Sequence, residues 1–212
     1  MNTHRFSLLP VAAVAFISVA QAQPPASAAP EAQVQAAVEN VLGAIQADAD
    51  ARRGDLSKTV AIVERRFLPY TDFERTTRLA VGAAWREATP EQRQQLFEQF
   101  QALLVRSYAL SLAQLREQNV KFRYQPVQAG SNAADVVVGT RVLSNGDDMQ
   151  IDYRLQRTAA GWKIYDINMM GAWLIEIYRR QFAAILARDG LPGLLSYLNR
   201  HNARVSGVSA GG

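Results

Sequence analysis

The chain has 212 residues, of which 49% are hydrophobic and 20% charged, and its formal net charge is +4. It contains no cysteine and two histidines, His4 and His201. Disulfide scaffolds, thiol nucleophiles and cysteine-ligated metal centres are therefore excluded, and neither a Ser-His-Asp triad nor a multi-histidine metal site is expected. The charge is small and scattered, which argues against nucleic-acid binding.

The first 22 residues have the pattern of an export signal. Arg5 gives a positive start, residues 8–20 form an apolar run, and Ala20-Gln21-Ala22 fits a cleavage site. The run is shorter than the ~20 residues that cross a bilayer, so an uncleaved anchor is the less favoured alternative. The expected divisions are a signal peptide over 1–22, cleaved near Ala22, a disordered lead-in over 23–30, a single folded domain over 31–205 and a flexible tail over 206–212.

Apolar residues recur at helical spacing through the first half of the expected domain. Thr71-Asp72-Phe73-Glu74 fits a capping box with Thr71 as the N-cap, and Thr89-Pro90-Glu91-Gln92 fits another with Thr89 as the cap. The predicted helices cover residues 31–53, 56–66, 71–81 and 90–117.

The pattern then changes to period two, which is typical of strands. In the segment 149–156, Met149, Ile151 and Tyr153 share one face and polar residues the other, as in an antiparallel sheet covered on one side. The predicted strands cover 120–124, 135–143, 149–156 and 162–167, with a hairpin at Asn145-Gly146, and two helices follow over 172–188 and 191–202. We therefore expect an α+β fold with helices packed on about four antiparallel strands and a helical subdomain.

The residues give little support for catalysis. Asp147-Asp148 lies in a predicted turn, where aspartate is favoured, and Asp166 fits a structural hydrogen-bonding carboxylate better than a catalytic acid. No glycine-rich loop resembles a phosphate cradle. Arg179-Arg180 follows an apolar run, so contact with a phosphate headgroup stays open beside solvated helix charge.

Large apolar side chains come from several predicted elements at once. Core packing is the default interpretation for any one of them, and Trp173 is evenly balanced between core and ligand contact. Together they also suit the walls of a pocket for an apolar ligand. They are Phe97, Phe100, Leu104 and Tyr108 of the long helix, Met149, Ile151 and Tyr153 of the third strand, and Met169, Met170, Trp173 and Ile177 after the fourth.

Three stretches carry a family resemblance. Residues 67–112 read FLPYTDFERTTRLAVGAAWREATPEQRQQLFEQFQALLVRSYALSL, residues 162–182 read WKIYDINMMGAWLIEIYRRQF, and residues 190–194 read GLPGL. They resemble the MlaC / toluene-tolerance (Ttg2-type) family of periplasmic phospholipid-binding proteins, and the resemblance spans about residues 34–200. The chain departs from the family pattern at Met170-Gly171-Ala172-Trp173 and at Ile177, which make the strand–helix junction more apolar.

The resemblance implies a phospholipid carrier that maintains the lipid asymmetry of the outer membrane. Its sheet would be curved and related to nuclear-transport-factor-like and cystatin-like folds, with acyl chains between sheet and helices. The implied location is the periplasm of a Gram-negative bacterium. The implied partners are an inner-membrane ABC transporter complex and an outer-membrane lipoprotein–porin complex. We expect a monomer without catalytic activity, with no metal and no cofactor besides the phospholipid cargo.

The resemblance also implies roles for Tyr108 and Ala172 as lipid contacts and for Arg93 as a headgroup or partner contact. The alternatives are a carrier for another lipid such as a hopanoid, a small enzyme using Asp166 with Tyr153 or Tyr165, and an adaptor that binds only protein. Residue pattern adds the remaining predicted lipid contacts Phe100, Leu104, Met149, Ile151, Tyr153, Met169 and Trp173, and Arg179 as a second headgroup or partner contact.

Overall fold

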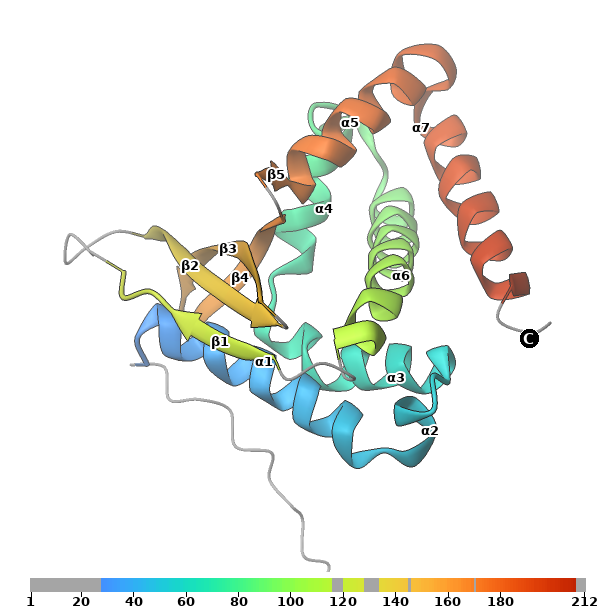
Figure 1. Ribbon diagram of the computed structural model, residues 1–212. Helices are drawn as coiled ribbons and strands as arrows, with labels where there is room; N and C mark the ends of the chain where they lie inside the picture. Colours follow the sequence, from blue (N-terminus) through green and yellow to red (C-terminus); the bar gives the residue numbers. More distant parts are fainter. Residues whose placement is uncertain (1–27, 116–119, 128–133, 145, 170, 209–212) are drawn as a thin grey trace, which may run out of the picture.

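The computed structural model describes residues 28–115, 120–127, 134–144, 146–169 and 171–208. The predicted signal peptide and most of the lead-in lie outside these residues. The N-terminal half is helical, with α1 (Pro30–Ala47), α2 (Ala49–Arg52), α3 (Leu56–Arg66), the 3-10 helix η1 (Leu68–Tyr70), α4 (Phe73–Val81), α5 (Ala84–Glu87) and α6 (Pro90–Leu115). Then follow β1 (Lys121–Tyr124), β2 (Asp135–Ser144), β3 (Asp147–Thr158), β4 (Gly161–Met169), β5 (Ala172–Trp173) and α7 (Leu174–Val208) (Figure 1).

The first predicted helix, over 31–53, is in fact two helices. Asp48 separates them, because its carboxylate accepts the backbone N–H groups of Asp50 and Ala51, both at 2.9 Å, and so caps α2. Helix α1 also begins at Pro30, the last residue of the predicted lead-in.

The two predicted capping boxes have different outcomes. At α6 the box is confirmed, since the Gln92 N–H donates to Thr89 Oγ1 at 3.2 Å and the Thr89 N–H donates to Gln92 Oε1 at 3.0 Å. At α4 the predicted N-cap is wrong: Asp72 caps the helix by accepting the Arg75 N–H at 2.9 Å. Thr71 instead donates its hydroxyl to the Leu68 carbonyl and forms a bridge with Ile164 of β4.

The sheet is antiparallel with the order β1-β2-β3-β4-β5, which confirms the predicted α+β class. It has one strand more than the four expected, because residues 172–173 pair with β4 before α7 begins at Leu174. Asn145 of the predicted hairpin lies outside the described residues, but Ser144 and Asp147 on either side pair in register.

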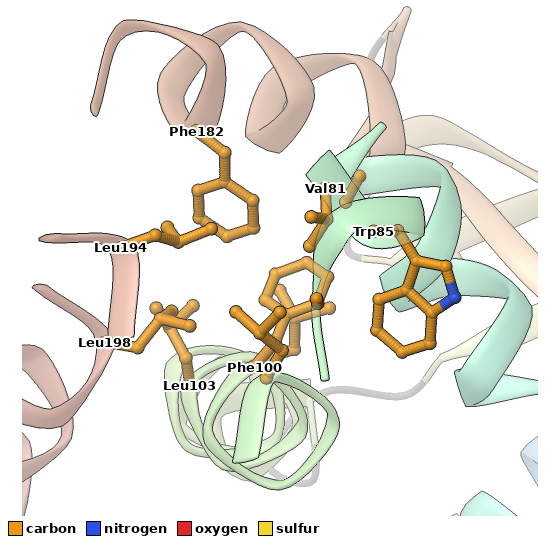
Figure 2. Close-up of a cluster of buried hydrophobic side chains, with 11 residues drawn as sticks. Val81, Trp85, Phe100, Leu103, Phe182, Leu194 and Leu198 are labelled. Carbon is orange, nitrogen blue, oxygen red and sulfur yellow. The ribbon is translucent and has the colours of Figure 1, made fainter. Parts of the chain in front are cut away.

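Three buried clusters make up the core. One joins α1 to one face of the sheet, here called the inner face, through Val34, Ala37 and Val38 against Val138, Tyr153 and Leu155. A second joins α1, α2 and α3 to α6. The third is purely helical, from α4, α5, α6 and α7, and corresponds to the predicted helical subdomain (Figure 2). Helix α6 contributes to the second and third clusters and so connects the sheet-bound and purely helical regions of the fold.

Helix α7 consists of two arms that meet at Gly190. The φ of Gly190 is +64° and its ψ is −165°, a backbone conformation that residues other than glycine rarely adopt. The predicted helix break at this residue is therefore present, and the second arm folds back beside α6 (Figure 1). This arm continues to Val208, so the start of the predicted tail is helical, while residues 209–212 lie outside the described ranges.

Candidate functional site

A cavity of about 210 Å³ lies between the inner face of the sheet and the helices. An engineered apolar cavity of about 150 Å³ in another protein holds benzene, so this space is large enough for a portion of an apolar chain. Its helical wall is formed by Val38, Val41 and Leu42 of α1, Val63 and Phe67 around the end of α3, Phe73 and Thr76 of α4, and Leu104, Val105, Tyr108 and Ala109 of α6. The opposite wall includes Phe122 of β1, Ile151 and Tyr153 of β3, Ile164, Ile167 and Met169 of β4, and Leu174 of α7.

The few polar groups of the cavity wall are engaged by the fold or kept neutral. Thr76 donates its hydroxyl to the Tyr165 carbonyl at 2.6 Å, and Thr71 donates to Leu68. Burial raises the pKa of Tyr153 far above its ordinary range, and burial also raises the pKa of Tyr108 against the opposing effect of a hydrogen bond with Tyr178. Both phenols therefore stay protonated at neutral pH, and the wall suits an uncharged, apolar ligand.

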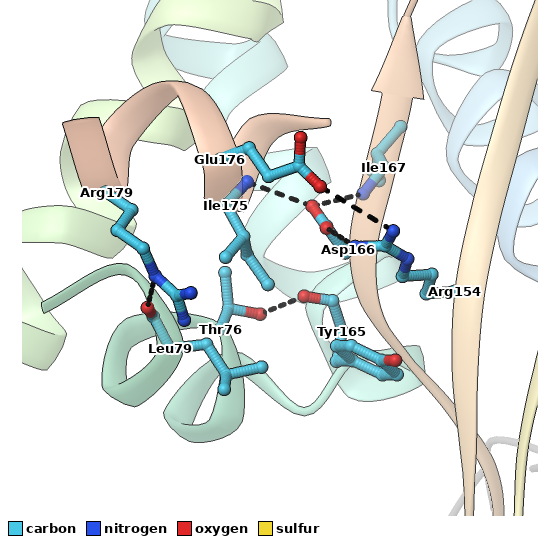
Figure 3. A network of polar contacts seen from close by, with 9 residues as sticks. All are labelled: Thr76, Leu79, Arg154, Tyr165, Asp166, Ile167, Ile175, Glu176 and Arg179. Atoms are coloured by element: carbon cyan, nitrogen blue, oxygen red, sulfur yellow. Dashed lines mark hydrogen bonds and ion pairs between the residues drawn. The ribbon is translucent and has the colours of Figure 1, made fainter. Parts of the chain in front are cut away.

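Among the described residues, Asp166 is the only carboxylate that lines the cavity. A β-bulge places it there: Arg154 pairs with Asp166 and Leu155 with Ile164, which leaves Tyr165 as an extra residue in β4. The Asp166 carboxylate accepts the N–H of Ile167 at 3.0 Å and of Ile175 at 3.1 Å, and it pairs with Arg154 at 3.1 Å (Figure 3). Burial raises its pKa, while these hydrogen bonds and Arg154 oppose the rise.

Five of the nine predicted lipid contacts line the cavity, namely Leu104, Tyr108, Ile151, Tyr153 and Met169. The structure places the other four elsewhere. Phe100 is 1% exposed in the helical core (Figure 2). Its ring lies 5.0 Å from that of Tyr178 and 5.1 Å from that of Phe182. Met149 lies near the hairpin end of β3, and Ala172 and Trp173 form β5, where the Trp173 ring packs under Arg154.

The two predicted arginine contacts lie away from the cavity and bind backbone carbonyls of neighbouring helices. Arg93 of α6 donates to Trp85 at 3.0 Å and to Arg86 at 3.1 Å, which ties α6 to α5. Arg179 of α7 donates to the Leu79 carbonyl at 2.8 Å, which ties α7 to α4 (Figure 3). These contacts give both arginines a role in helix packing, and neither lines the cavity.

Residue patterns missed the contribution of α1 and α3 to the cavity. Val38, Val41 and Leu42 follow the helical spacing that predicted α1, but such spacing is the same for a filled core and for a cavity wall.

Within the described ranges, no helix is long and apolar enough to cross a membrane, and no group of three metal-ligating side chains is present.

An α+β fold that encloses an apolar cavity between sheet and helices defines a binding protein for apolar ligands. The model of the MlaC protein family matches residues 35–200, so the chain belongs to the MlaC family. The intermembrane phospholipid transport system binding protein MlaC of Haemophilus influenzae is 23% identical over 178 residues, 82% of this chain and 83% of that protein. Toluene tolerance protein ttg2D of Pseudomonas putida is 25% identical over 167 residues, 78% of this chain and 76% of that protein.

A solved structure gives the fold an experimental counterpart. The phospholipid-binding protein of Ralstonia solanacearum, solved in complex with a phospholipid, is 42% identical to this chain and superposes with a TM-score of 0.80. The match covers 84% of this chain and 99% of that one. The expected family and fold class are both confirmed by these likenesses.

Proposed function

We propose that this chain is a phospholipid carrier whose cavity holds acyl chains between the sheet and the helices. The observation that carries the proposal is the apolar cavity, in a fold that matches a protein solved with a phospholipid. Burial of each CH₂ group contributes roughly 0.8 kcal/mol, so acyl chains of about 30 such groups supply ample affinity after the costs of ordering. The charged headgroup stays near solvent, since the described wall has no cationic side chain to neutralise a phosphate.

Loading a two-chain lipid requires movement. The cavity of about 210 Å³ is smaller than the ~300–1,000 Å³ of pockets that enclose drug-sized ligands. The sheet and the helices must therefore separate to admit two acyl chains. A carrier of this kind exchanges its cargo by widening and closing the same space.

The proposed setting is the periplasm, reached through the export signal over residues 1–22. The proposed partners are an inner-membrane ABC transporter complex and an outer-membrane lipoprotein–porin complex, and the carrier would act as a monomer. The name of the Haemophilus influenzae relative, which refers to an intermembrane phospholipid transport system, supports this setting.

A carrier without catalytic activity fits the site better than an enzyme does. A catalytic acid or base needs a carboxylate that is free to exchange a proton with a ligand. The Asp166 carboxylate already accepts two backbone N–H groups and pairs with Arg154. The raised pKa of Tyr153 also makes this phenol a poor base at neutral pH.

A lipid-transfer assay tests the proposal. Donor vesicles carry a self-quenched fluorescent phospholipid, acceptor vesicles carry none, and the exported protein is added at increasing concentrations. We expect the rate of dequenching to rise in proportion to protein concentration and to vanish with heat-denatured protein. A rate equal to that of vesicles alone would contradict the proposal, and transfer of a hopanoid but not of phospholipid would replace the proposed cargo.

A further inference from the structure

The first turn of α7 is attached to the sheet by a buried carboxylate. N–H groups in the first turn of a helix have no partner within the helix. Asp166 of β4 supplies one for Ile175, with the N–H of Ile175 at 3.1 Å from Oδ1. A negative charge is also favoured at this end of the helix dipole. Asp166 therefore caps α7 from a different element, and its side chain is fully buried in doing so.

Arg154 of β3 completes the attachment. Its Nη1 lies 3.1 Å from Asp166 Oδ2, its guanidinium carbon lies 3.8 Å from the centre of the Trp173 ring, and its Nη2 lies 3.8 Å from Glu176 Oε1. One side chain thus contacts β4, β5 and α7, and its contacts with Asp166 of β4 and Glu176 of α7 are drawn in Figure 3. We call the pair of Asp166 and Arg154 the clasp.

The clasp lies where the cavity wall passes from sheet to helix. Asp166, Ile167 and Met169 line the cavity from β4, and Leu174 lines it from the first residue of α7. Beyond this turn, α7 packs into the helical cluster. Separation of α7 from β4 would therefore open the cavity along this junction, and the clasp is a polar contact that resists the separation.

We propose that Asp166 and Arg154 are positioning residues that hold α7 on β4 and thereby limit the rate at which lipid enters and leaves the cavity. The inference rests on the proposed carrier function. It assigns to these two residues a kinetic role in cargo exchange, separate from contact with the lipid itself.

The clasp is also sensitive to protonation. Burial raises the pKa of the Asp166 carboxyl, so acidification neutralises this group at a higher pH than an ordinary aspartate. Neutralisation removes the attraction to Arg154. The charged and titratable groups around the Asp166 carboxyl are Arg154 of β3, Glu176 of α7 and Tyr165 of β4. The guanidinium carbon of Arg75 of α4 in turn lies 3.8 Å from the centre of the Tyr165 ring.

The experiment compares lipid transfer by loaded wild type, Asp166→Asn and Arg154→Met. Asparagine keeps an oxygen for the Ile175 N–H but loses the ionic attraction, and methionine removes the cation. We expect transfer to be about three- to tenfold faster in each variant, and the double variant to be no faster than the faster single one, because both residues act in one contact.

Asp148→Asn is the matched control, since it breaks another β-sheet ion pair, Arg141–Asp148 at 2.6 Å. Its transfer rate should stay within about twofold of wild type.

A pH series separates the clasp from a general structural role. As the pH is lowered from neutral, we expect the wild-type rate to rise when Asp166 takes up a proton, at a higher pH than an ordinary aspartate would, and the Asp166→Asn rate to stay fast and flat. If Asp166→Asn does not fold, Arg154→Lys takes its place, because lysine keeps the charge but loses the planar stacking on Trp173. Lipid-loaded, folded variants with wild-type rates would overturn the clasp alone, whereas wild type that holds no lipid would overturn the carrier function.

Discussion

Ile151→Asp is expected to reduce the phospholipid bound per protein at least tenfold. Ile151 lies on the inner face of β3 and lines the cavity, so its replacement puts a short carboxylate against the acyl chains. An aspartate cannot extend its charge to solvent as a lysine can, and an uncompensated charge in apolar surroundings costs several kcal/mol. A tenfold loss of affinity corresponds to about 1.4 kcal/mol. Because the uncompensated charge costs more than this, the loss of bound lipid should be at least tenfold.

Gln150→Asp is the matched control for this change. Gln150 is the neighbouring residue of β3, faces the opposite side of the sheet and is exposed, so both variants carry aspartate in the same strand. Lipid extraction and quantification by mass spectrometry, normalised to protein, measures the outcome. Equal lipid content in folded Ile151→Asp and Gln150→Asp would show that the cavity is not the binding site.

Phe100→Ala is expected to lower the free energy of unfolding by about 3–5 kcal/mol. The Phe100 ring is 1% exposed in the helical cluster, where Figure 2 shows it near Phe182. It packs edge-on against Tyr178 and Phe182, and the Phe73 ring lies 5.7 Å away. Truncation leaves a void among α4, α6 and α7 that the surrounding rings cannot fill. Because Phe100 does not line the cavity, folded protein should retain its lipid.

Urea unfolding of delipidated protein, followed by circular dichroism, measures this loss. Delipidation is needed because a ligand bound to the folded state adds to its apparent stability. Phe97→Ala is the control, since Phe97 is on the same helix but only partly buried and should cost clearly less. A folded Phe100→Ala protein without lipid, or one as stable as Phe97→Ala, would contradict the division between helical core and cavity wall.

The elements of the fold that local sequence determines were predictable, and those that distant contacts determine were not. The box at Thr89 and Gln92 closes within four residues, so its sequence suffices to place the start of α6. Thr71 has equally suitable neighbours, but its hydroxyl donates to the Leu68 carbonyl and its backbone forms the bridge to Ile164 of β4, so Asp72 caps the helix instead. Only the tertiary structure could decide between them.

The same limit explains the outcome for the site. Phe100 and Leu104 are four residues apart and lie on one face of α6, yet Leu104 lines the cavity and Phe100 does not. Both belong to the helical cluster, and they differ in their place along the helix, because Leu104, one turn further on, also reaches the cavity. Periodicity specifies a face and not a position along the axis. The bulge that puts Asp166 beside α7 is likewise invisible in the strand's alternation.

Native mass spectrometry of the freshly purified, exported protein, followed by lipid extraction, tests the carrier function most directly. We expect a protein mass increased by one or more bound phospholipids at stoichiometric occupancy, with the extra mass lost on delipidation and restored by incubation with phospholipid vesicles. Protein that carries no lipid after purification and takes up none from vesicles would contradict the carrier function.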